Sequence, residues 1–306
     1  MLIKNPVKSL LTARKLSIVS DSVDFLSECR KLGFLTHALK KGIKLPGHSV
    51  AFSFSDEAAR LIFETAKITP VRKCIFCPLH VFDASVGSAL YTLSLILKSD
   101  FIEALNTQGK ILSILKHHKS LHLVGEHSMA SVVIKEDSTP YAMIKSDLEE
   151  NFIHSVAEFF EVHYAHMNAG HPCPFSIEGY LKVSGILSAR RSKHVEESKS
   201  LEIRIEKLMK SISVSAGSIT IENNQIVSLK NADGEHLELL EQAAGTRRLS
   251  VTEFAIGVNR SIQPLINYAV NSQLNEGIEG VHLAIGDGST GYHIDFLSPG
   301  VTAVPI

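Results

Sequence analysis

Short apolar runs alternate with amphipathic segments over about the first 125 residues. Helical spacing occurs in residues 23–42, and the acidic, capping sequence that starts at Ser55 predicts a second helix. The longest apolar stretch, residues 85–98, predicts a buried helix. The runs with strand-like hydrophobicity are residues 15–20, 49–54, 74–81 and 120–124. Strands that alternate with helices in this way predict an α/β domain.

The pattern changes in the second half of the chain. Residues 151–166 predict an amphipathic helix, on which His163 and His166 share a face. Two further helices are predicted at residues 235–244 and 262–274. The strand-like segments are residues 180–190, 201–206, 218–229, 251–257 and two more near the carboxyl terminus, and the third contains the hairpin turn signal ENNQ. We therefore expect an α/β domain in residues 1–150 and a strand-rich α+β domain in residues 151–306.

Composition excludes several classes of partner. Hydrophobic residues make up 44% of the chain and charged residues 21%, as in an ordinary globular protein. The formal net charge is -1 without a long block of like charge, so neither nucleic acid nor a membrane is expected as a partner. No apolar run reaches the ~18 residues of a membrane span. The 4 cysteines are irregularly spaced and the first residues lack the features of a signal peptide, which predicts a cytoplasmic location.

Four groups near the carboxyl terminus can bind a metal. His293 and Asp295 form an H-x-D pair in a predicted strand, so their side chains point to the same face. His282 begins another apolar segment, and the Gly-rich sequence GDGSTG between the two allows a tight return. Glu253 stands at the start of a third strand. Two imidazoles and one carboxylate suit a catalytic zinc or a non-haem iron site.

Other histidines and cysteines are weaker candidates. His163, His166 and His171 lie within nine residues, and either metal binding or contact with a substrate or a partner subunit would explain them. Surface histidines without chemistry are the competing interpretation. Cys74 and Cys77 form a C-x-x-C pattern inside an apolar run rather than at the start of a helix, which favours two buried thiols over a redox pair.

The sequences TEFAIGVN, NEGIEGVHLAIGDGS and HIDF resemble the closing motifs of the aminopeptidase T family of metallopeptidases. The related 2,5-dihydroxypyridine dioxygenases share this ending. The resemblance covers roughly residues 170 to 298. In the peptidases it implies a two-metal site that matches Glu253, His282, His293 and Asp295. In the dioxygenases the matching histidines and aspartate would hold a single Fe(II). The resemblance also implies a homodimer.

Two positions depart from the peptidase pattern. The family has an earlier metal-bridging glutamate in a region that here reads HPCPFSIEGYL, where only His171 or Glu178 could substitute. The family's tyrosine falls near Ser289, so Tyr292 is close to the matching position without occupying it. Because a pair of cations needs bridging carboxylates, the loss of one favours a single divalent metal.

Three functions follow as hypotheses. The first is a metal-dependent, aminopeptidase-like hydrolase that acts on a peptide or amide, with zinc, manganese or cobalt bound. Glu253 then serves as a ligand or as the general base. The second is a mononuclear Fe(II) dioxygenase that acts on a small aromatic molecule. The third is a relative that has lost catalysis and binds a peptide. In all three, His163, His166, His171 and Tyr292 are secondary candidates for contact with the substrate.

Overall fold

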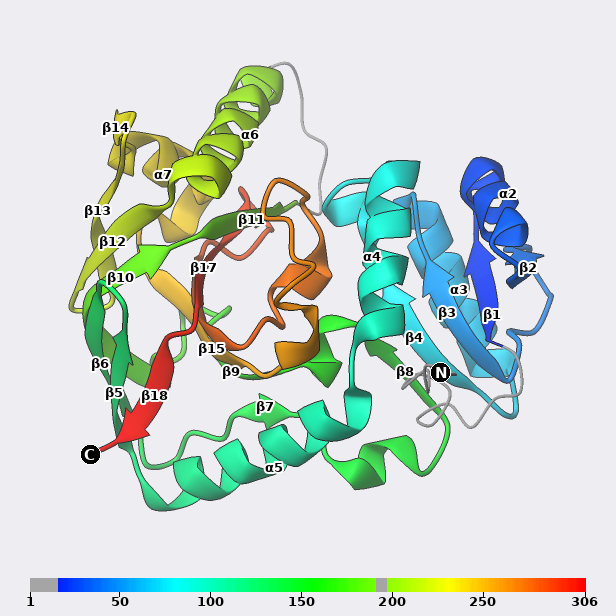
Figure 1. The fold of residues 1–306 in the computed structure, drawn as a ribbon, viewed down its shortest axis with the longest axis horizontal. Helices are drawn as coiled ribbons and strands as arrows, with labels where there is room; N and C mark the ends of the chain where they lie inside the picture. The colour runs from blue at the N-terminus through cyan, green and yellow to red at the C-terminus, as the bar shows by residue number, and fades with distance from the viewer. Residues whose placement is uncertain (1–15, 191–196) are drawn as a thin grey trace.

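The computed structural model describes residues 16–190 and 197–306, which form three β-sheets and the helices around them (Figure 1). The start of the chain, where we expect no signal peptide, lies outside the described residues. The fold is mixed α/β, with large sheets and several helices. Within the described part of the chain, no helix is both long enough and apolar enough to cross a membrane.

A parallel five-stranded sheet contains most of the strands from the first half of the chain. Its strand order is β2-β1-β3-β4-β8, and every neighbouring pair is parallel. The strands are β1 Ser17–Ser20, β2 Leu35–Ala38, β3 His48–Phe52, β4 Lys73–Cys77 and β8 Phe152–Ser155, and the helices beside them are α2 Val23–Lys31, α3 Asp56–Ile68 and α4 Val86–Lys98. The Ser55 hydroxyl accepts a hydrogen bond from the backbone N–H of Ala58 (3.1 Å), so the predicted cap of α3 is present. The carboxyl ends of the parallel strands meet at one edge of this sheet.

The second sheet is antiparallel. Its strand order is β14-β13-β12-β10-β6-β5-β18. The strands are β5 Ser120–Gly125, β6 Ser128–Ile134, β10 Phe175–Val183, β12 Gly217–Glu222, β13 Gln225–Asn231, β14 Gly234–Glu235 and β18 Thr302–Pro305. The predicted hairpin is β12–β13, and its turn residues Asn223 and Asn224 have φ values of 49° and 63°. The turn signal in the sequence therefore identified this hairpin correctly.

The third sheet carries the residues of the predicted metal site. Its strand order is β11-β17-β16-β15-β9-β7. The strands are β7 Tyr141–Ala142, β9 Glu161–Ala165, β11 Gly185–Ala189, β15 Val251–Gly257, β16 Gly280–Ile285 and β17 His293–Pro299, and the remaining α-helices are α5 Phe101–His117, α6 Glu197–Ser215 and α7 Leu237–Ala243. Short 3-10 helices occupy Leu79–Val81, Lys145–Leu148, Ala157–Phe159, Gly245–Arg247, Arg260–Ile262 and Gln273–Asn275.

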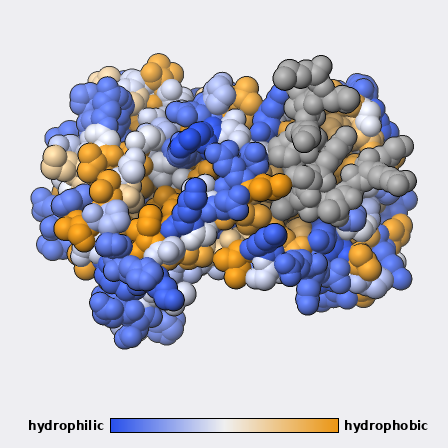
Figure 2. Space-filling view, turned by 60° about the horizontal axis from the view of Figure 1, so that its bottom comes forward, coloured by the Kyte–Doolittle hydropathy of each residue, from blue (hydrophilic) through white to orange (hydrophobic). Residues whose placement is uncertain are grey.

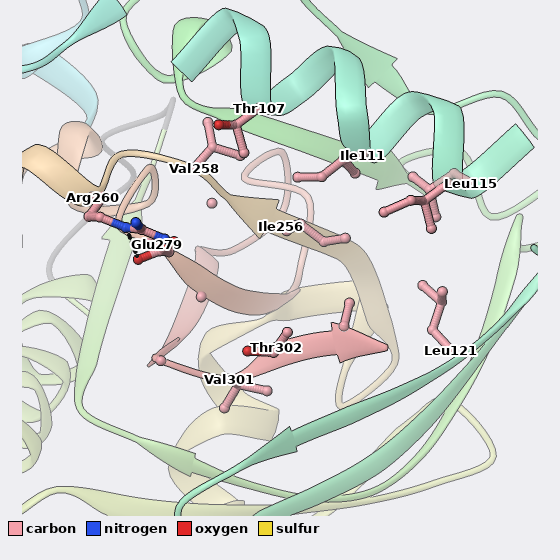
Figure 3. Close-up of a pocket in the computed structure, with 15 residues that line it drawn as sticks. Thr107, Ile111, Leu115, Leu121, Ile256, Val258, Arg260, Glu279, Val301 and Thr302 are labelled. Carbon is pink, nitrogen blue, oxygen red and sulfur yellow. Dashed lines mark hydrogen bonds and ion pairs between the residues drawn. The ribbon is translucent and has the colours of Figure 1, made fainter. Parts of the chain in front are cut away.

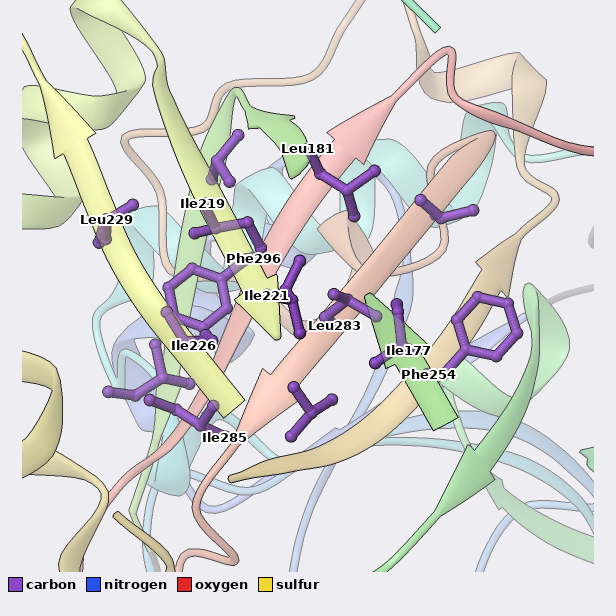
Figure 4. Packing of buried hydrophobic residues seen from close by; sticks show 14 of the residues in the cluster. Ile177, Leu181, Ile219, Ile221, Ile226, Leu229, Phe254, Leu283, Ile285 and Phe296 are labelled. Atoms are coloured by element: carbon purple, nitrogen blue, oxygen red, sulfur yellow. The ribbon is translucent and has the colours of Figure 1, made fainter. Parts of the chain in front are cut away.

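A hydrophobic core lies between the second and third sheets (Figure 4). Phe254, Leu283 and Phe296 come from β15, β16 and β17 and belong to the same buried cluster as Ile219 and Ile221 of β12. Alternation along a strand sends neighbouring residues to opposite faces. One face of the third sheet therefore packs in the core, and residues such as Glu253, His282 and Asp295 point away from it.

Three predicted elements are wrong. The helix at residues 23–42 ends at Lys31, because Gly33 adopts a left-handed φ of 86° and the chain turns into β2. The strand predicted at 201–206 is part of α6, whose buried Ile205, Leu208 and Ile212 follow helical spacing. The helix at 262–274 is absent, because the Asn275 side-chain amide donates to backbone carbonyls of this segment instead.

The helix predicted at residues 151–166 is also wrong, and this error matters most for the site. The segment forms β8, the 3-10 helix Ala157–Phe159 and β9. β8 pairs with β4 of the parallel sheet, and β9 pairs with β15 of the third sheet. These pairings are made with strands far away in the sequence, so local periodicity did not reveal them.

The sheets do not divide the chain at a single point. β5 and β6 precede residue 150 but pair within the second sheet, and β8 follows residue 150 but completes the first sheet. The division into domains 1–150 and 151–306 stays a prediction. Figure 2 shows one face of the molecule, on which hydrophobic side chains lie in separate groups among hydrophilic ones. The predicted homodimer also stays a prediction.

Candidate metal centre

Six acidic and imidazole side chains gather on one face of the third sheet. Four neighbouring strands supply them. The cluster consists of Glu161 and His163 on β9, Glu253 on β15, His282 on β16, and His293 and Asp295 on β17. Ala255 lies opposite both His163 and His282 in the strand register, and Ala284 lies opposite Glu253 and Asp295. These small side chains leave room for the longer ones between them.

The predicted ligands do come together. His293 Nε2 lies 3.2 Å from Asp295 Oδ1 and 3.6 Å from Glu253 Oε2. His282 Nε2 lies 3.7 Å from Glu253 Oε1 and 3.5 Å from Glu161 Oε2. The two oxygens of Glu253 therefore face different histidines, which places this carboxylate at the centre of the cluster.

These separations match the spacing of ligands around one ion. Two ligands that bind a tetrahedral zinc ion at ~2.1 Å lie about 3.4 Å apart. Three of the four distances, at 3.5–3.7 Å, are longer than ordinary hydrogen bonds between nitrogen and oxygen. His163 Nδ1 also lies 3.1 Å from Glu161 Oε1, so the cluster combines short pairs with separations that suit the ligands of an ion.

Several buried atoms of the cluster lack a hydrogen-bond partner among the described residues. They include Glu161 Oε2, Asp295 Oδ2 and both ring nitrogens of His282. His282 and Asp295 are each only 1% exposed. An unsatisfied buried polar atom is costly, and a divalent cation would satisfy carboxylate oxygens together with one ring nitrogen of His282. The residues present therefore fit a metal.

One hydrogen bond orients an imidazole toward the cluster. His293 Nδ1 lies 3.1 Å from the carbonyl oxygen of Gly286. In the neutral tautomer that donates this hydrogen bond, Nε2 carries the lone pair that can bind a metal. Gly286 precedes the turn that joins β16 to β17. Such a bond to a backbone carbonyl is a common way to orient a histidine that binds a metal.

Charges within the cluster shift the pKa values of its members. Burial opposes ionisation of Glu253, but nearby imidazoles, chiefly those of His282, His163 and His293, lower its pKa to about 2. Burial would lower the pKa of His293, yet Asp295 and Glu253 raise it to about 10. Glu276 lies beside this cluster, and burial together with the charges of Asp295, Glu161 and Glu253 raises its pKa well above the usual range.

Sequence reasoning missed Glu161 and Glu276. Potential ligand atoms of Glu161, His163 and Glu253 lie within 4.8 Å of one another, so Glu161 is a full member of the cluster. The available signal was the E-x-H spacing of Glu161 and His163, which mirrors the H-x-D spacing of the other pair. The predicted helix at 151–166 concealed it, because residues two apart share a face only on a strand.

The remaining candidates lie elsewhere. His166 contacts Arg247 (3.0 Å) and the carbonyl oxygen of His171 (2.8 Å), and the His171 residue is exposed. Glu178 is exposed on β10 of the second sheet. Tyr292 lies under the guanidinium of Arg190, 5.0 Å from its ring centroid. Cys74 and Cys77 are both buried free thiols, as the sequence indicated.

A cavity of about 920 Å³ gives access to the cluster. Glu161, His163, Glu253, His293 and Glu276 are among the residues that line it. Other lining residues come from α3 and from the segment after β4, at the carboxyl edge of the parallel sheet. Crevices at this edge are the usual ligand sites of open parallel sheets. The cavity is large enough to hold a small molecule or a few residues of a peptide.

A smaller cavity of about 350 Å³ lies under α5, apart from the cluster (Figure 3). Ile111 and Leu115 of α5 line it together with Ile256 of β15. Arg260 and Glu279 form an ion pair at one side of this cavity, with a shortest separation of 2.5 Å. None of the six cluster residues lines it.

The fold and the cluster together define a mixed α/β protein with an arrangement of carboxylates and imidazoles suited to divalent cations. The chain belongs to the family of crocagin biosynthetic proteins CgnE/B, whose sequence model matches residues 13–306. A comparison with curated proteins found no match.

Two solved structures are similar to this chain at low sequence identity. Wild-type AmpT from Thermus thermophilus is 14% identical with a TM-score of 0.47, over 99% of this chain and 98% of that chain. The 2,5-dihydroxypyridine dioxygenase from Pseudomonas putida KT2440 is 9% identical with a TM-score of 0.44, over 95% of this chain and 89% of that chain.

Proposed function

We propose that this chain is a metal-dependent enzyme that acts on a peptide or amide held in the 920 Å³ cavity. One observation carries the proposal: buried donor atoms of the cluster lie at ligand-like separations and lack hydrogen-bond partners among the described residues. The family's description refers to crocagin biosynthesis, so we further propose that the substrate belongs to such a biosynthesis.

Glu253 is assigned as a ligand rather than as the general base. Its Oε1 faces His282 and its Oε2 faces His293, which leaves neither oxygen free for proton transfer. Glu161 adds a carboxylate beside His282. The sequence favoured a single metal because one bridging carboxylate lacked a match. With Glu161 present, the cluster has the additional carboxylate that a pair of cations would need.

A bound divalent cation supplies Lewis acidity and lowers the pKa of a water molecule that it binds. The protein's own groups position the reactants and move the proton. His293 is oriented by the carbonyl of Gly286, and the strands hold the other ligands rigidly. Glu276 lines the same cavity and is a carboxyl group outside the proposed ligand set, so we assign to it the transfer of a proton.

The number of carboxylates favours hydrolysis over oxygenation. A mononuclear Fe(II) oxygenase needs two histidines and one carboxylate, with positions left open for oxygen and substrate. Here Glu161, Glu253 and Asp295 all lie within 4 Å of an imidazole. A site so rich in carboxylates resembles the two-cation hydrolytic type more closely.

Metal analysis of the purified protein tests this proposal. We compare the parent with His293→Ala and with the control His122→Ala, which removes an exposed histidine on β5. We expect about one or two equivalents of zinc, manganese or cobalt in the parent and the control, together with cleavage of peptide amides. Because His293→Ala lacks one of the proposed ligands, its affinity for the metal should be more than about 100-fold lower than that of the parent.

The other hypotheses give different results in the same experiment. Bound Fe(II) with oxygen uptake and without amide cleavage would establish the dioxygenase instead. A parent protein without metal, whose peptide binding is unchanged in His293→Ala, would leave only a binding protein. Either result overturns the proposed hydrolase.

A further inference from the structure

Part of the wall of the cavity beside the metal cluster is aromatic. Phe63 of α3, Phe76 of β4 and Phe82 line it. The parallel sheet brings them together, because α3 follows the carboxyl end of β3 and Phe82 follows the carboxyl end of β4. Four of the six cluster residues, Glu161, His163, Glu253 and His293, line the same cavity.

Phe63 is accessible and contacts a second aromatic ring. The residue is 42% exposed. Its ring packs edge-on against Phe76 with centroids 5.0 Å apart, and Phe76 is only 6% exposed. Phe63 therefore presents an accessible apolar surface next to the buried ring of Phe76.

Small and charged residues in the lining restrict what this surface can bind. Ala59, Ala157 and Ala189 also line the cavity and leave space in front of the aromatic rings. The acidic lining residues are Asp56, Glu158, Glu161, Glu253, Glu276 and Asp287, and Arg60 is the arginine among the lining residues. An acidic ligand side chain would meet this negative charge, whereas an uncharged apolar one would not.

We propose that Phe63 and Phe82 form a subsite for a large apolar side chain, preferably aromatic, of the peptide substrate. This inference rests on the proposed function, because it assumes that a peptide lies between the aromatic wall and the metal centre. The backbone amide at the cluster and a neighbouring side chain at the aromatic wall would then be bound together. The subsite selects the substrate by the size and hydrophobicity of that side chain.

Binding of uncleavable dipeptide analogues tests the subsite. The probes are X-Ala-amides in which the first amide is reduced to a methylene-amine and X is Phe, Leu, Ala or Asp. Isothermal titration calorimetry measures each probe with the parent protein, Phe63→Ala, Phe82→Ala and the control Tyr180→Ala. Tyr180 is 44% exposed and lies on β10 of the second sheet, outside the cavity.

We expect the parent to bind the Phe analogue about tenfold more tightly than the Ala analogue, which corresponds to about 1.4 kcal/mol. This ratio should fall to about one in Phe63→Ala and Phe82→Ala and stay unchanged in Tyr180→Ala. Equal binding of the Phe and Ala analogues by the parent, or an unchanged ratio in both phenylalanine variants, overturns the subsite. Phe63→Leu, which keeps an apolar side chain, should retain part of the preference.

Metal content and cleavage distinguish the two levels of the proposal. The parent could lack metal and fail to cleave the corresponding unmodified peptides but still prefer the Phe analogue. This result would support the proposed subsite and contradict the proposed hydrolase. Metal binding and peptide cleavage by the parent without any preference between Phe and Ala would support the proposed hydrolase and contradict the proposed subsite. The phenylalanine variants should keep the parent's metal content, because neither residue belongs to the cluster.

Discussion

At the scale of single residues, burial controls the reactivity of Cys74. The residue is 0% exposed, and burial raises the pKa of its thiol to about 11. Because the thiolate is the nucleophile, we expect Cys74 to resist iodoacetamide at pH 8 in the folded protein. Mass spectrometry should show Cys173, which is partly exposed, modified first, and both residues modified in urea. Modification of Cys74 as fast as Cys173 in the folded protein would contradict this.

Individual residues of the cluster differ in how well the sequence revealed them. His293 and Asp295 could be predicted because strand alternation alone places residues two apart on the same face. Glu161 and His163 have the same spacing, but the surrounding residues have a helical pattern. The sequence therefore predicted a helix where the structure has the strand β9. Glu276 follows a 3-10 helix at a position that no local motif marks, so only the folded chain shows it beside the cluster.

At the scale of elements, the β12–β13 hairpin depends on Asn224. This residue has a left-handed φ of 63°, its Oδ1 accepts from the Ile177 N–H (2.6 Å), and its Nδ2 donates to the Phe175 carbonyl (2.9 Å). Asn224→Ala loses both bonds and strains the turn. We expect the free energy of unfolding to fall by about 2–3 kcal/mol in urea denaturation.

A neighbouring substitution separates the two contributions. Asn223 also has a left-handed φ, of 49°, and is exposed. Asn223→Ala should therefore cost only the backbone strain, about 1 kcal/mol. Equal losses in the two variants would show that the side-chain bonds of Asn224 contribute nothing.

The local hydrophobic pattern located some strands, but it missed others that form by pairing with distant strands. The sequence located β15, β16 and β17 because their hydrophobic runs are bounded by glycine or polar residues. It missed β9, because pairing with β15 stabilises that strand more than its own periodicity favours a helix. It also missed β18, a short strand at the edge of the second sheet that pairs with β5 far away in the sequence.

At the scale of the whole molecule, metal binding should stabilise the fold. Four strands supply the residues of the cluster, so the cluster forms only when these strands of the third sheet have paired. A cation that binds only the folded state adds about 2.7 kcal/mol when its free concentration is 100 times the Kd. We expect added zinc or manganese to raise the Tm of the parent in differential scanning fluorimetry, and a chelator to reverse the increase.

His293→Ala provides the control for that experiment. Removal of this ligand should abolish most of the shift in Tm, whereas His122→Ala should show the full shift, because His122 is exposed on the second sheet. A parent Tm that does not respond to any divalent cation would count against a metal centre in this protein.

The sequence alone determined the local features of this protein. The strand and helix periods of most elements, the Asn-Asn turn, the capped start of α3 and the H-x-D pair all depend on residues close together in the chain. The tertiary structure decided the rest. Glu161 and His163 lie beside Glu253 because β9 pairs with β15. The aromatic wall and residues of the cluster line the same cavity because elements of two sheets contribute to its lining. These residues are far apart in the chain, and local hydrophobic patterns carry no information about which distant strands pair.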